Sequence, residues 1–158
     1  MTLSIPDSRV DFRHPGLPLR KIELIEASFA RVEPRARAMA IAFYDELFET
    51  MPGLRAVFPR DDLEQRRIVG SFVGFVVTNL RSPHRLALLL ERLGSRGMLG
   101  DLTNEETAAI CRVILMVLRE YEGDRWTVET SHAWALGMAW TLSALRRGDS
   151  HRELARAG

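Results

Sequence analysis

The chain has 158 residues, 46% of them hydrophobic and 27% charged, which is the balance of one soluble globular domain. Its formal net charge of +1 gives no electrostatic reason to expect binding to nucleic acid or to an acidic membrane surface. The single cysteine, Cys111, excludes an intrachain disulfide, and no apolar run is long enough to span a bilayer. There is also no signal-peptide pattern. These features predict a cytoplasmic protein.

Residues 1–20 contain three prolines among polar residues and predict an extended N-terminal arm. Helical periodicity begins near Lys21, where apolar residues recur three or four positions apart. Pro34 ends this first helix and lies well in the first turn of a second one, which runs to Thr50. Pro52 and the glycine after it then stop the second helix.

A third helix is predicted from Asp62 to Leu80, and a fourth opens at Pro83. Three glycines at 94, 97 and 100 predict that the end of the fourth helix is frayed or turned. Thr103 with Glu106 three residues later matches a capping box, which starts a strongly apolar helix.

The last helix begins at Thr127 and carries apolar residues to Leu145, and the polar sequence from Arg146 onward predicts a loose tail. No alternating apolar and polar run marks a strand. We therefore predict an all-α protein of six to seven helices. Its domain spans residues 21–147, between the arm and a tail at 148–158.

The segment FYDELFETMPGLRAVFP, residues 43–59, is followed by Gln65 seven positions after Phe58. With the later segments PHRLALLLERLG and RWTVETSHAW, it resembles the globin family, specifically bacterial single-domain haemoglobins and the globin part of flavohaemoglobins. The resemblance covers about Ile22 to Arg147. It implies a globin-like fold with helices A, B, C, E, F, G and H, in which the helices of 104–121 and from Thr127 are G and H.

The resemblance also implies the distal half of a haem pocket. By position, Tyr44 looks like the distal tyrosine, Phe58 like the aromatic residue that stacks on haem, and Gln65 like the distal polar residue. Ile68 and Val69 would line the distal wall one turn further on. A tyrosine hydroxyl and a glutamine amide can both hydrogen-bond a bound diatomic molecule in a dry pocket.

The proximal half departs from the family pattern. Leu93 belongs to the segment that, in these haemoglobins, continues to the histidine that ligates the iron, but Gly97 stands at that position. Thr107 likewise replaces the tyrosine that supports the histidine. The resemblance therefore implies a pocket lined by Leu93 and Gly97 without its usual iron ligand.

Other residues leave minority alternatives open for an iron ligand. Met98 is adjacent to Gly97, although consecutive helical residues point about 100° apart. Tyr44 is a possible phenolate ligand from the distal side, and Cys111 a possible covalent attachment point for a tetrapyrrole. The four histidines are interpreted as surface or cap residues: His14, His84, His132 and His151.

We predict a globin-like binding or sensory protein of bacterial type that is haem-free or weakly haem-binding, with a small apolar ligand such as a fatty acid in its pocket. The resemblance implies such a role because haem-less globin domains serve as sensory modules in bacterial stress regulation. The alternative is an atypical globin that holds haem b and binds or senses O2 or NO through Tyr44 and Gln65.

A third possibility is a structural homodimer that uses the two apolar helices G and H as its interface. An enzyme is not predicted, because the chain shows no nucleophile with a base at plausible spacing, no phosphate-binding glycine loop and no metal-ligand cluster.

Overall fold

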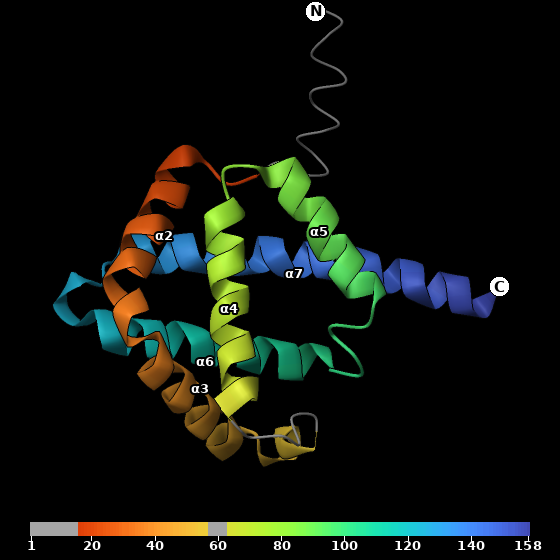
Figure 1. Cartoon of the computed structure of the whole chain (residues 1–158), viewed down its shortest axis with the longest axis horizontal. Helices are drawn as coiled ribbons and strands as arrows, with labels where there is room; N and C mark the ends of the chain where they lie inside the picture. Colours follow the sequence, from red (N-terminus) through yellow and green to blue (C-terminus); the bar gives the residue numbers. More distant parts are fainter. Residues whose placement is uncertain (1–15, 57–62) are drawn as a thin grey trace, which may run out of the picture.

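A computed structural model describes residues 16–56 and 63–158 (Figure 1). All regular secondary structure in these two ranges is helical, which confirms the predicted all-α class. The described ranges contain six helices: α2 (Leu19–Val32), α3 (Ala36–Thr50), α4 (Leu63–Asn79), α5 (Pro83–Ser95), α6 (Asn104–Glu122) and α7 (Val128–Ala157). Short 3-10 turns follow α2, α3 and α6: η1 (Glu33–Arg35), η2 (Pro52–Arg55) and η3 (Gly123–Arg125).

The helix ends follow the capping signals in the sequence. The Thr103 hydroxyl accepts a hydrogen bond from the Glu106 amide at 3.0 Å, and the Glu106 carboxylate accepts one from the Thr103 amide at 2.9 Å. This is the predicted capping box, and it fixes the start of α6. Thr127 caps α7 in the same way by accepting from the Thr130 amide at 3.0 Å.

The prediction of a loose tail from Arg146 is wrong, because α7 continues as one helix to Ala157. Gly148, within the expected tail, is buried against the main chain of α5. Further along, Arg152 forms an ion pair with Asp149 at 2.8 Å on the same helix. Polar composition therefore failed to predict this part of the fold, since the helix is held by a small residue packed against a distant segment.

Helices α5 and α7 cross with their backbones in direct contact. A Cβ atom added to Gly94 would collide with the carbonyl oxygen of Leu145, and one added to Gly148 would collide with the carbonyl oxygen of Glu91. Each helix therefore supplies a glycine where the other passes, and no larger residue fits at either position.

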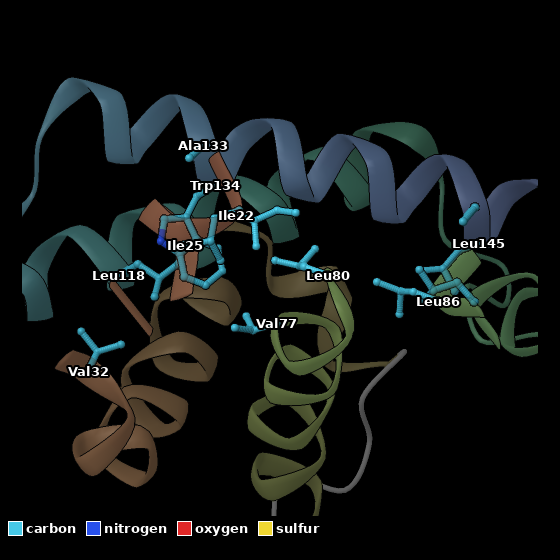
Figure 2. Close-up of a cluster of buried hydrophobic side chains, with 12 residues drawn as sticks. Ile22, Ile25, Val32, Val77, Leu80, Leu86, Leu118, Ala133, Trp134 and Leu145 are labelled. Carbon is cyan, nitrogen blue, oxygen red and sulfur yellow. The ribbon is translucent and has the colours of Figure 1, made fainter. Parts of the chain in front are cut away.

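The core consists of two clusters of buried apolar side chains. The first joins α2, α4, α5, α6 and α7, and Figure 2 shows Trp134 of α7 beside Ile25 of α2 at its centre. The second joins α3 and α6 through the turn that contains Leu54. In Figure 1, α4 crosses in front of both α6 and α7, and the candidate site lies between these helices.

Candidate functional site

A cavity of about 330 Å³ separates α4 from α6 and α7. Ile25 of α2 and Phe43 of α3 also contribute to its wall, as does the segment 98–102 that joins α5 to α6. The described lining residues are mostly apolar: Ile25, Phe43, Phe72, Val73, Val76, Val77, Leu80, Met98, Leu99, Leu102, Thr107, Ile110, Cys111, Ile114, Trp134, Gly137, Met138, Thr141, Leu142 and Leu145.

The few polar side chains in this wall already have hydrogen-bond partners. Thr107 Oγ1 donates to the Thr103 carbonyl at 2.8 Å, and Thr141 Oγ1 donates to the Gly137 carbonyl at 2.8 Å. Trp134 Nε1 donates to Ser28 Oγ at 2.9 Å. In the described ranges, no buried side-chain nitrogen or oxygen lacks a partner. The described polar groups of the wall are therefore satisfied within the protein, and the wall attracts a ligand chiefly through the hydrophobic effect.

Ser28 accepts the Trp134 hydrogen bond and also hydrogen-bonds Glu122, so it connects the cavity wall to the ion pair between Glu122 and Arg31. The Glu122 side chain is 0% exposed and accepts from Arg31 Nε at 2.6 Å and from Arg31 Nη2 at 2.9 Å. Burial raises the pKa of Glu122, but hydrogen bonds from Arg31 and Ser28 lower it, and the lowering prevails. Glu122 is therefore held as a carboxylate that binds both Arg31 and Ser28.

The segment between α5 and α6 brings part of the cavity wall to the molecular surface. Met98 lines the cavity and is also 42% exposed, so it occupies both the wall and the molecular surface. Gly97 and Gly100 on either side of it have φ angles of +87° and +55°. Residues that carry a side chain rarely adopt these φ angles, so the two glycines are required for this tight turn.

Cys111 is the chain's only thiol and lines the cavity from α6. Burial raises its pKa, and the nearby charges of Arg146 and Arg112 oppose this shift only in part. A thiol held in its neutral form is a poor nucleophile and behaves as a small apolar wall group.

Tyr44, the predicted distal residue, is fully buried in the second core cluster. Its ring packs edge-on to Phe43 at 5.0 Å between centroids and beside Phe48 at 5.7 Å. Tyr44 is absent from the described cavity lining, whereas its neighbour Phe43 is part of it. In this turn of α3, the side chain that lines the described cavity is therefore that of Phe43 and not that of Tyr44.

The remaining distal predictions lie outside the described structure. Phe58 falls within residues 57–62, and the side chains of Gln65, Ile68 and Val69 in the first turns of α4 are likewise not described. The described wall of α4 begins at Phe72, two turns after Gln65.

On the predicted proximal side, neither Leu93 nor Gly97 is part of the described cavity lining. Leu93 packs against the first core cluster. A Cβ atom at Gly97 would lie 3.5 Å from Arg152 Nη1, so a side chain there would meet the α7 guanidinium. Met98, the next residue, faces the cavity instead.

The described cavity lining contains no histidine. The histidines within the described ranges, His84, His132 and His151, are all exposed, and none lines the cavity. These ranges also contain no group of three or more His, Cys, Asp or Glu residues that could hold a metal ion. No described arginine or lysine is part of the wall.

Sequence reasoning missed the contributions of α7 to the site. Gly137 and Thr141 lie four residues apart on α7 and both line the cavity together with Trp134. A small residue and a threonine at this spacing mark one helix face, which is the signal that would have pointed to them.

No protein-family model matches the chain, and no curated protein matches it. Among the helices that the structure describes, none combines the length and apolar character needed to cross a membrane.

Proposed function

We propose that this protein binds a small apolar molecule in the cavity between α4 and α6/α7, and acts as a haem-free, globin-like binding or sensory protein. The observation that carries the proposal is the size of the cavity together with the chemistry of its wall. A volume of about 330 Å³ lies within the range of natural small-molecule sites, roughly 300–1,000 Å³. The wall is largely apolar, as expected for such a site.

The free energy of an empty cavity supports an occupant. At about 24 cal/mol per Å³, the measured penalty for unfilled core volume elsewhere, a void of this size corresponds to about 8 kcal/mol. That figure is an upper bound because the cavity is not fully enclosed. It is nonetheless comparable with the whole stability of a domain, roughly 5–15 kcal/mol. A bound ligand offsets this loss by restoring contacts to the wall.

The helix order supports the globin-like part of the proposal. Two helices, a short 3-10 turn at Pro52–Arg55 and four further helices follow one another as the family resemblance implies. By this correspondence, the cavity lies between the counterparts of helices E, G and H. Two observations support the haem-free part. The described histidines are exposed, and a side chain at position 97 would point toward Arg152.

The test is a titration with N-phenyl-1-naphthylamine, an uncharged fluorescent probe of apolar sites. We expect saturable fluorescence enhancement at one probe per chain. Ile110→Phe extends a cavity-wall side chain into the space, so it should weaken binding at least tenfold. Ile41→Phe makes the same change on α3 at a side chain that is 36% exposed and outside the described lining, so it should leave binding unchanged.

Equal effects of the two variants, or no saturable binding to the wild type, would contradict the proposed cavity site. The haem-free assignment is tested separately by expression with surplus haem. A sharp, stoichiometric Soret band that survives gel filtration would overturn it.

A further inference from the structure

The polar side chains in the α6 and α7 walls share one property, which is that each has already donated its hydrogen. Thr107 gives its hydroxyl hydrogen to the Thr103 carbonyl, and Thr141 gives its hydrogen to the Gly137 carbonyl. A threonine hydroxyl has one hydrogen and two acceptor lone pairs. Each of the two wall threonines therefore retains acceptor capacity but no hydrogen for a ligand.

The other groups in these helical walls leave the same imbalance. Trp134 is a donor only, and its indole hydrogen is used by Ser28. Backbone amides within the helices bond along the helix. No described arginine, lysine, asparagine or glutamine lines the cavity, and in the described α6 and α7 walls the remaining side-chain donor is the weak S–H of Cys111.

The described α6 and α7 walls accept hydrogen bonds but hardly donate them, so they discriminate between ligand groups that lie against them. A carbonyl or carboxylate is an acceptor only, so once buried here it loses its bonds to water without replacement. A hydroxyl can donate to Thr107 or Thr141 and keep one good hydrogen bond. Leaving a buried acceptor unsatisfied corresponds to about a tenfold loss of affinity or more.

We infer that the ligand class of this cavity is a neutral hydrocarbon that carries a hydroxyl donor, a small apolar alcohol, in preference to the matching ketone or carboxylate. This inference rests on the proposed function, since it names the kind of molecule that the same cavity takes. Thr107 and Thr141 are the residues that set this preference.

The test compares 2-octanol, 2-octanone and octanoate, which have the same chain length and differ in hydrogen-bonding capacity. Their dissociation constants are measured by displacement of N-phenyl-1-naphthylamine. We expect the wild type to bind 2-octanol about tenfold more tightly than 2-octanone, and octanoate more weakly still. In the double variant T107V/T141V the alcohol should lose this advantage while the ketone binds as before.

Thr78→Val is the matched control, because Thr78 is exposed on α4 and lies outside the described lining. It should preserve the tenfold preference, and thermal melting should show that all variants are folded. Equal affinities for alcohol and ketone in the wild type, tight octanoate binding, or a preference that survives in T107V/T141V would overturn this inference and leave apolar binding intact. Absence of saturable binding by all probes would overturn the proposed function itself.

Discussion

Trp134 donates its indole hydrogen to Ser28 at 2.9 Å, and this bond joins residues 106 positions apart in the chain. It has two consequences. It removes the one strong side-chain donor from the described cavity wall, and it connects that wall to the Glu122–Arg31 ion pair through Ser28. The ion pair between Glu122 and Arg31 therefore lies outside the described cavity lining.

Glu122→Gln should destabilise the protein by about 2–4 kcal/mol, because it leaves Arg31 without its buried partner. We favour the lower half of this range, since the Arg31 side chain is 32% exposed and water can solvate it. Glu26→Gln disrupts a similar bidentate pair with Arg81 that lies at the surface, so its effect should be much smaller. Urea unfolding measures both, and equal losses would show that burial of Glu122 contributes nothing.

The stabilisation from Glu122 should also depend on pH. Its pKa in the folded protein lies below the ordinary value of 4.5, so the unfolded chain binds the proton more readily. The contribution is therefore complete above about pH 4.5 and is lost as the pH falls through the lowered folded pKa. The stability difference between wild type and Glu122→Gln should be constant from pH 6 to 8 and shrink below about pH 4.5. A difference that grows on acidification would contradict the assigned direction of the shift.

Gly94→Ala should destabilise the fold by about 3 kcal/mol or more, because its methyl group would collide with the Leu145 carbonyl and force α5 away from α7. Gly74→Ala is the matched control in helix α4. Its methyl group would meet only the Phe29 ring at an ordinary distance of 3.5 Å. It should therefore be neutral or slightly stabilising. Thermal unfolding of both variants measures the difference, and a well-folded Gly94→Ala protein would refute the close helix crossing.

Gly97→His should not create a haem site, although Gly97 stands where the haemoglobins that the sequence resembles have their iron ligand. The new side chain would meet the Arg152 guanidinium, and its backbone would be held at φ +87°. Met98→His is the informative comparison, because Met98 faces the cavity. Absorption spectra after haem addition decide the point: a stoichiometric Soret band in Gly97→His would contradict the geometry described for this turn.

The sequence could predict those features of the fold that local signals encode. The prolines at 34 and 52 and the capping box at Thr103 define helix boundaries whatever the chain packs against. The extension of α7 could not be predicted in this way. It depends on Gly148 meeting Glu91 of α5, a contact between residues 57 positions apart whose fit is invisible in local composition.

The candidate site was predicted less well, for a related reason. Neighbouring residues on a helix point about 100° apart, so the rotation of α3 decides whether Phe43 or Tyr44 faces the cavity. In the turn after α5, packing likewise decides that Met98, and not Gly97, lines the cavity. These one-residue differences follow from tertiary packing.

The alkylation rate of Cys111 by iodoacetamide tests most directly whether a ligand occupies this cavity. Cys111 is the chain's only thiol, it lines the cavity, and burial raises its pKa, so it should react more slowly than in the urea-unfolded chain. Saturating 2-octanol or N-phenyl-1-naphthylamine should slow the reaction at least severalfold further in the folded protein. An unchanged rate at full saturation would place the bound molecule elsewhere and contradict the proposed site.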